Sequence, residues 1–241
     1  PVTFLFLLGG TNAFNLADGL DGLAGGMGVL CLCGTGLLAY TVGDNAVGAA
    51  AVMMVGALIG FLRFNTHPAR VFMGDAGSQA LGFCAAFLAL LLTQDPGTPL
   101  STALPLLLLG VPIIDTAMVM IERLLDGVSP FRADRRHIHH RLLSLGFAHR
   151  EAVSLLYVLQ GGLLVAAWLM RYDPDSMVAM VFTGFALLVV LPHASVASLR
   201  ALLSPMDFAP VIAAPIVAAL AAGAGARAAA AYFHAQAARV G

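Results

Sequence analysis

Three short polar motifs interrupt an otherwise apolar chain, and the first begins at residue 12. Asn12, Asn15, Asp18 and Asp21 recur every three residues, so on a helical or 3₁₀ segment they would share one face. Two carboxylates three residues apart can hold or flank a divalent cation, or act as a base beside one. The simpler alternative is that Asp18 and Asp21 cap helices next to turn glycines.

The second motif is Gly74-Asp75-Ala76-Gly77-Ser78, which opens directly into an apolar run. An aspartate at a helix N-terminus places an oxygen ligand beside free backbone N–H groups, a geometry suited to a metal-bound phosphate. A plain N-cap role for Asp75 is an equal alternative. Arg70, five residues earlier, can pair with Asp75 or with a substrate phosphate.

The third motif combines four arginines with three histidines between Arg132 and Arg141. Such a cationic cluster suits an anion such as a diphosphate. Two alternatives stay open: a zinc site on His137, His139 and His140, and a positively charged anchor on the cytoplasmic side.

Asp115 is the one strongly ionisable residue well inside an apolar run. An intramembrane carboxylate is a functional candidate by default. The equal alternative is a structural pair with a nearby arginine.

Composition identifies the bilayer as the chain's surroundings. Of 241 residues, 60% are hydrophobic and only 10% are charged, and the formal net charge is −1. These values exclude an ordinary soluble domain, for which about 25% charged residues is typical. They also leave no basic surface for nucleic acid.

We expect an all-α polytopic membrane protein that forms a single domain over residues 1–241. Residues 1–9 are apolar but too short to cross the membrane, so we expect them to be the end of a truncated membrane helix. The segment 208–226 is either a seventh crossing or an interfacial helix. Six further crossings are expected in the charge-free runs Gly22–Gly43, Ala46–Leu62, Ala76–Gln94, Pro96–Ile114 (continuing to Ile121 past Asp115), Ala152–Met170 and Ser176–Leu199.

Counting the crossings sorts the loops into two sets on opposite sides of the membrane. Residues 10–21, 63–75, 122–151 and about 200–207 hold nine arginines, whereas 44–45, 95 and 171–175 hold Arg171 alone. The positive-inside rule therefore places the first set, with all three motifs, in the cytoplasm. The loop 122–151 carries the Arg/His cluster.

Together, in this order and spacing, the three motifs resemble those of the polyprenyl-phosphate N-acetylhexosamine-1-phosphate transferases, glycosyltransferase family 4, of bacterial envelope synthesis. The segments concerned are Asn12-Ala13-Phe14-Asn15 with Asp18-Gly19-Leu20-Asp21-Gly22, and Val71-Phe72-Met73-Gly74-Asp75-Ala76-Gly77-Ser78. The segment Ser129-Pro130-Phe131 with Asp134-Arg135 and His137-Ile138-His139-His140 is similar to the branch that uses GlcNAc (WecA type).

The resemblance implies transfer of GlcNAc-1-phosphate from UDP-GlcNAc to undecaprenyl phosphate at the inner membrane. Its products are GlcNAc-diphospho-undecaprenol and UMP, the first membrane step of an envelope polysaccharide, with Mg²⁺ or Mn²⁺ as cofactor. In this implied site Asp75 binds the metal and Asp18 and Asp21 are catalytic. Substrate binding falls to Asn12, Asn15, Arg70, Arg135, His137, His139 and His140, with Asp115 as a further candidate.

The family also carries an aspartate-rich pair on an earlier cytoplasmic loop, and no Asp-Asp dipeptide occurs in this chain. We therefore expect residues 1–241 alone to be an inactive, N-terminally truncated piece. Two other functions stay open: a phospho-MurNAc-pentapeptide transferase (MraY type) and, from another class, a membrane transporter. A homodimer is an option that the sequence leaves undecided.

Overall fold

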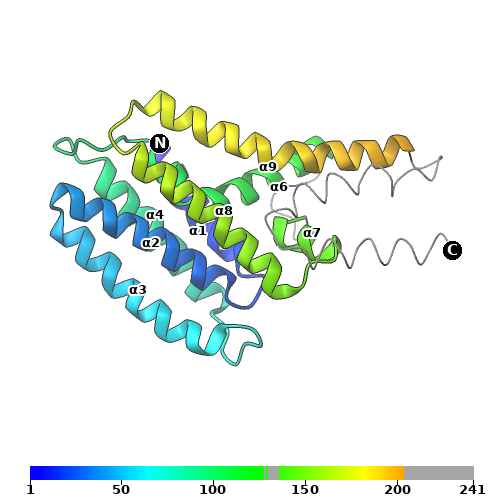
Figure 1. The fold of residues 1–241 in the computed structure, drawn as a ribbon, viewed down its shortest axis with the longest axis horizontal. Helices are drawn as coiled ribbons and strands as arrows, with labels where there is room; N and C mark the ends of the chain where they lie inside the picture. Colours follow the sequence, from blue (N-terminus) through cyan, green and yellow to red (C-terminus); the bar gives the residue numbers. More distant parts are fainter. Residues whose placement is uncertain (128, 130–135, 204–241) are drawn as a thin grey trace.

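A computed structural model describes residues 1–127, 129 and 136–203, with residues 191–203 as backbone alone. The described part is helical, as expected for an all-α polytopic membrane protein (Figure 1). Its helices are α1 (Val2–Ala17), α2 (Leu23–Val42), α3 (Asn45–Asn65), α4 (Gly74–Thr93), α5 (Leu104–Leu108), α6 (Gly110–Leu125), α7 (Ile138–Ser144), α8 (His149–Leu169) and α9 (Asp175–Leu203).

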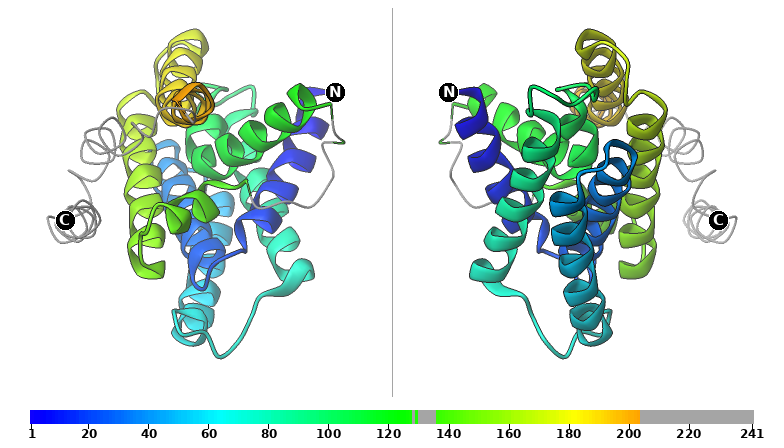
Figure 2. Two further views of the ribbon diagram at one scale, coloured as in Figure 1. Left: turned by 90° about the vertical axis from the view of Figure 1, so that its right-hand side faces the viewer. Right: turned by 90° about the vertical axis from the view of Figure 1, so that its left-hand side faces the viewer.

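Four of these helices, α2, α3, α4 and α8, are long and apolar enough to cross a bilayer. Each coincides with a charge-free run of the sequence, because such runs contain nothing that must stay in water. Helix α2 lies centrally and packs against α3, α4 and α8 (Figure 2). The count of six to seven crossings stays a prediction, and the segment 208–226 lies outside the described residues.

The crossing expected over Pro96–Ile114 and on to Ile121 is not one continuous helix, because the chain breaks there into α5 and α6 at Leu109. Pro112 has no N–H to donate to the Leu108 carbonyl, so an uninterrupted helix would leave that carbonyl unpaired. The buried Gln160 side chain of α8 fills the break. Its amide donates to the carbonyls of Leu107 and Leu108 at 3.2 and 2.9 Å, and its oxygen accepts from the Val111 N–H at 3.0 Å.

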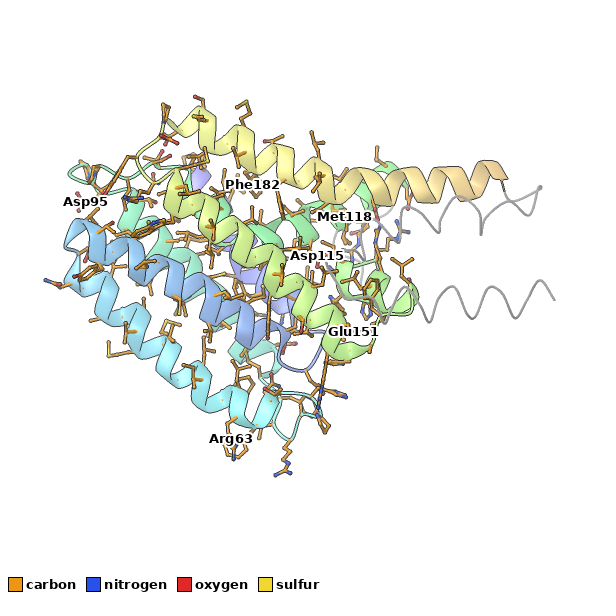
Figure 3. The ribbon with its side chains drawn as sticks, in the orientation of Figure 1. Arg63, Asp95, Asp115, Met118, Glu151 and Phe182 are labelled. Atoms are coloured by element: carbon orange, nitrogen blue, oxygen red, sulfur yellow. The ribbon has the colours of Figure 1, made fainter. Side chains whose placement is uncertain are left out.

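The polar loops gather at one end of the bundle. The loops that follow α1 and α3 lie at this end together with the C-terminal end of α6 and with α7, whereas the loops that follow α2, α4 and α8 lie at the other (Figure 1). Labelled side chains make the same division, with Arg63 and Glu151 at the first end and Asp95 at the second (Figure 3). The alternation expected from the sequence is therefore confirmed, and it brings the motif-bearing loops together.

Close contact between α1 and α4 sets the distance between the first two motifs. A Cβ atom on Gly82 would lie 2.6 Å from the Gly10 carbonyl oxygen and 2.8 Å from the Phe14 Cβ. We expect Gly82→Ala to destabilise the protein by about 1–3 kcal/mol, because backbone cannot move aside as a flexible side chain can. Thermal unfolding in detergent measures this. Gly56→Ala is the matched control, since nothing lies within 4 Å of its Cβ position, and equal melting of both variants would contradict the prediction.

Candidate active site

Helix α1 ends at Ala17, so the expectation that Asn12, Asn15, Asp18 and Asp21 share one helical face is wrong. The chain turns through residues 18–22, and Gly22, directly before α2, has a φ of +83°, which favours glycine. Asn12 stays on the helix, where its amide donates to the Leu8 carbonyl at 2.8 Å. The turn sends Asp18 and Asp21 to different neighbours.

Asn15 joins the first motif to the second. Its amide nitrogen donates to Ser78 Oγ at 2.9 Å and lies 3.3 Å from Asp75 Oδ1. Asp75 is the second residue of α4 and is exposed, whereas Ser78 is buried and donates back to the carbonyl of Gly74 at 3.1 Å. The result is an exposed carboxylate held at a helix N-terminus by an amide from the neighbouring helix.

Asp18 lies close enough to Asp75 for the two charges to repel. Partial burial and the Asp75 carboxylate together raise the pKa of Asp18 to about 6. Two carboxylates with an amide and a hydroxyl at hand form an oxygen-rich, negatively charged set, and such a set suits a hard divalent cation such as Mg²⁺. The donor chemistry therefore fits the metal that the sequence resemblance implies.

Asp115 organises the third motif. Its Oδ1 accepts from the Ile138 N–H at 2.7 Å, and its Oδ2 lies 3.0 Å from His137 Nδ1. Asp115, His137 and Ile138 are 4–6% exposed, and Ile138 is the first residue of α7. The arginine partner considered from the sequence is therefore wrong: Asp115 pairs with His137 and places its charge at the N-terminus of α7.

His139 faces the turn that carries the aspartates. A Cβ atom on Gly19 would lie 2.3 Å from His139 Nε2, so only glycine leaves room for the ring. The ring is 2% exposed and stacks with that of His137 at 5.8 Å between centroids, and the His140 ring lies 4.2 Å from it on the other side. Its Nε2 is buried and has no hydrogen-bond partner among the described residues. The histidine motif thus contacts the first motif through one ring.

Burial of His139 makes stability depend on pH. Desolvation lowers the pKa of His139 to about 4, below its ordinary 6.5. The unfolded state therefore binds a proton between these values that the folded state does not, so stability should fall as pH drops below about 6.5 and level off near 4, by at most about 1.4 kcal/mol per pH unit. The raised pKa of Asp18 acts in the opposite sense below about 6, so the effect of His139 is expected in the comparison of Tm between the unmodified protein and His139→Gln, which should lose less stability on acidification. An unchanged slope in the variant would rule the explanation out.

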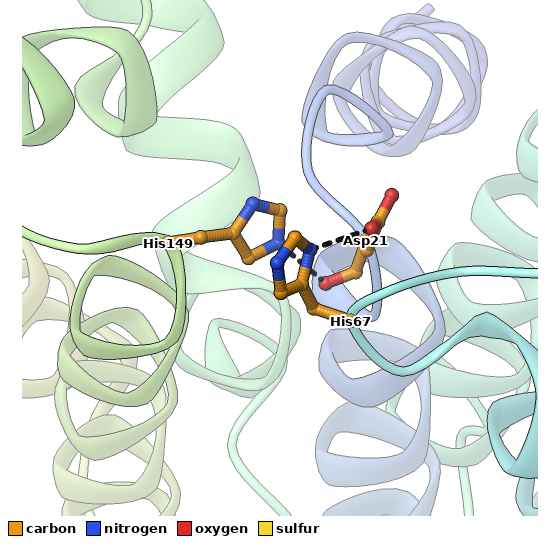
Figure 4. A group of neighbouring side chains, drawn as sticks. All are labelled: Asp21, His67 and His149. Atoms are coloured by element: carbon orange, nitrogen blue, oxygen red, sulfur yellow. Dashed lines mark hydrogen bonds and ion pairs between the residues drawn. The ribbon is translucent and has the colours of Figure 1, made fainter.

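Asp21 belongs to a separate group of side chains (Figure 4). Its Oδ2 lies 2.8 Å from His67 Nδ1 and accepts from the Ala69 N–H at 3.0 Å. His149 Nε2 lies 3.1 Å from the Asp21 carbonyl oxygen, and the rings of His67 and His149 stack at 4.2 Å. The Ala69 hydrogen bond, followed by the one with His67, lowers the pKa of Asp21.

The arginines are less concentrated than the sequence suggested. Arg136 pairs with Asp126, and Arg141 pairs with Glu122. Arg70 is exposed, and its backbone N–H donates to the Phe64 carbonyl at 2.7 Å. Arg135 lies outside the described residues.

Sequence reasoning missed two residues at this end of the bundle. His67 and His149 were not among the candidates predicted from the sequence. Neither belongs to a motif, and each contacts Asp21 only because the fold joins three loops. The proline after His67 and the position of His149 at the start of α8 are the only local signals that the sequence offers.

Comparison with known proteins gives one family. A model described as glycosyl transferase family 4 matches residues 1–93. Three similar proteins are an undecaprenyl-phosphate N-acetylglucosaminyl 1-phosphate transferase, described as probable, of Bacillus subtilis and the undecaprenyl-phosphate alpha-N-acetylglucosaminyl 1-phosphate transferases of Yersinia pestis and Escherichia coli K12.

The similarity covers most of this chain but a smaller part of each relative. The Bacillus protein is 40% identical over 159 residues, 66% of this chain and 44% of that protein. The Yersinia protein is 35% identical over 159 residues (64% and 44%), and the Escherichia protein is 32% identical over 178 residues (71% and 48%). The chain thus spans less than half the length of these curated relatives.

Proposed function

Because the chain belongs to glycosyl transferase family 4, we propose that its protein transfers GlcNAc-1-phosphate from UDP-GlcNAc to undecaprenyl phosphate. The products are GlcNAc-diphospho-undecaprenol and UMP. The observation that carries the proposal is the meeting of Asp18, Asp75 and the His137–His140 segment at one end of a membrane bundle. The printed names of the relatives support the sugar and the lipid.

The reaction brings two anionic phosphates together, so the site needs positive charge and oxygen ligands in fixed positions. Asp75 and Asp18 are the residues that would hold Mg²⁺, or Mn²⁺ in its place. The bound cation would neutralise phosphate charge during transfer. Asn15 orients Asp75 through its amide, and Ser78 holds Asn15 in turn.

The histidine segment supplies hydrogen-bond donors for the diphosphate of UDP-GlcNAc. Asp115 fixes the start of this segment through Ile138 and His137, and Gly19 lets His139 approach the Asp18 turn. His139 is neutral at pH 7 because burial holds its pKa near 4, so its Nε2 can form a hydrogen bond without bringing a charge. Arg70 and Arg135 are the proposed arginine contacts, and Asn12 contributes an exposed amide.

The bilayer supplies the acceptor. Helix α1 exposes large apolar side chains at Val2, Phe4, Leu5 and Leu8, and it packs against α6, which exposes Ile121, Leu124 and Leu125. A polyprenyl chain can lie along such a surface, with its phosphate at the polar end of the bundle. By the positive-inside distribution, we place this end in the cytoplasm, at the inner membrane of a bacterium.

The proposal is tested with the full-length protein in detergent with Mg²⁺ and undecaprenyl phosphate. UMP release from UDP-GlcNAc is compared with release from UDP-MurNAc-pentapeptide, and Asp75→Asn serves as the inactive control. Release from UDP-GlcNAc alone, lost in the variant, is the expected result. Release only from the pentapeptide substrate, or from neither, would contradict the proposed substrate.

A further inference from the structure

Two imidazoles and one carboxylate meet at the turn that follows α1, and the carboxylate is that of Asp21, for which the family resemblance implies a catalytic role. Asp21 comes from the turn after α1, His67 from the loop after α3 and His149 from the first residue of α8. One ring nitrogen of each histidine points at an oxygen of Asp21 (Figure 4): His67 Nδ1 at the carboxylate and His149 Nε2 at the main-chain carbonyl. Four potential ligand atoms, two nitrogens and two oxygens, therefore converge.

This convergence distinguishes the group from the other acidic and histidine residues. In the part of the chain that the structure describes, Asp21, His67 and His149 are the one set of His, Cys, Asp or Glu side chains whose ligand atoms all lie within 4.8 Å of one another. The zinc interpretation of His137, His139 and His140 loses support, because His137 Nδ1 faces Asp115.

We propose that Asp21, His67 and His149 bind a divalent transition-metal ion, with Zn²⁺ as the ion that fits the donor set best. Imidazole nitrogen suits zinc, whereas magnesium is bound by oxygen ligands. The ion would replace the hydrogen bond between His67 and Asp21, and the displaced proton would pass to solvent. The site is thus chemically distinct from the oxygen set of Asp18 and Asp75, and its metal binding does not depend on the transfer activity.

The required rearrangement is small. Tetrahedral zinc with ligands at about 2.1 Å keeps them about 3.4 Å apart. The hydrogen-bonded pairs at 2.8 and 3.1 Å would therefore open slightly, and the other separations, at most 4.8 Å, would close. The His67 side chain is 41% exposed and the Asp21 side chain 22%, which leaves the imidazole room to turn. The Arg150 guanidinium donates to the His67 carbonyl at 3.2 Å, and the Asp21 carboxylate would offset its charge.

Zinc in this position would connect three loops. The loop containing His67 leads into the Asp75 motif, and Asp21 lies three residues after Asp18. A bound ion would therefore restrain both segments that carry the proposed magnesium ligands. We expect Zn²⁺ to raise the Tm of the protein, because an ion that binds only the folded state stabilises it.

The direct experiment is a zinc titration of the full-length, chelator-treated protein in detergent, followed by calorimetry and by Tm. One Zn²⁺ per chain is expected, with excess Mg²⁺ unable to displace it. His67→Gln and His149→Gln should each weaken binding by about tenfold or more and remove the rise in Tm. His140→Gln is the matched control and should bind zinc as the unmodified protein does.

Three results would overturn the proposal: no zinc binding, unchanged binding in both histidine variants, or loss of binding in His140→Gln instead. A second measurement uses the unmodified protein alone, so it still tests the proposal if one of the two histidine variants does not fold. X-ray absorption at the zinc edge of the unmodified protein should show two imidazole ligands with oxygen as the remainder, and none or three would be equally decisive against it.

Discussion

Replacing Asp75 by asparagine is expected to reduce sugar-phosphate transfer by about 10³-fold or more while leaving Tm nearly unchanged. The side chain is exposed, and among the described residues its Oδ1 accepts one long contact, at 3.3 Å from Asn15, which the asparagine oxygen can also accept. The variant therefore keeps the shape and loses the negative charge that holds the cation. Removing a single electrostatic contact to a transition state costs about 10²–10³-fold, and losing the metal should cost at least as much.

Asp95→Asn is the matched control for this prediction. Asp95 is an exposed aspartate at the opposite end of the bundle, where its Oδ1 accepts from the Gly97 N–H at 2.8 Å (Figure 3). UMP release at saturating Mg²⁺ is measured for both. Activity above about a tenth of the unmodified level in Asp75→Asn would show that this carboxylate does not hold the cation.

Asp115→Ala is expected to lower the free energy of unfolding by about 3–5 kcal/mol and to abolish transfer. Removing the carboxylate leaves the buried His137 ring and the buried Ile138 N–H without their partner, and each unsatisfied buried polar group costs about 1–3 kcal/mol. The start of α7 would then be free to shift, and with it the histidines beside the Asp18 turn. Thermal unfolding and UMP release are measured together.

Conservative and neighbouring variants separate positioning from general destabilisation. Asp115→Asn keeps an oxygen for the Ile138 N–H and should retain more activity than Asp115→Ala. Thr116→Ala removes a buried hydroxyl that has no partner among the described residues, so it should change neither measurement much. Full activity in Asp115→Ala would contradict the role given to this carboxylate.

Charge-free runs were sufficient to locate α2, α3, α4 and α8, because a membrane segment must exclude charge over a fixed length. The alternation of loops then placed the motifs at one end. The break between α5 and α6 could not be predicted in this way, since it depends on Gln160 from a helix some fifty residues later. In a hydropathy profile, Gln160 is only one polar residue within an apolar helix.

The candidate site could likewise be predicted only in part. Motif spacing indicated Asp18, Asp21, Asp75 and the histidines as candidates, because their residue types suit phosphate and metal chemistry. Which of them lie together could not be predicted from the sequence. Asp18 turns toward Asp75, whereas Asp21 turns toward His67 and His149. This separation depends on the end of α1 at Ala17 and on the packing of α8, which are tertiary properties.

Transfer of the sugar together with its phosphate is the central claim, and a double label tests it most directly. UDP-GlcNAc labelled in both the sugar and the β-phosphate is given to the full-length protein with Mg²⁺ and undecaprenyl phosphate, and the lipid is extracted. The account predicts equal amounts of both labels in the lipid and release of UMP. Sugar label in the lipid without phosphate label, with release of UDP, would contradict it.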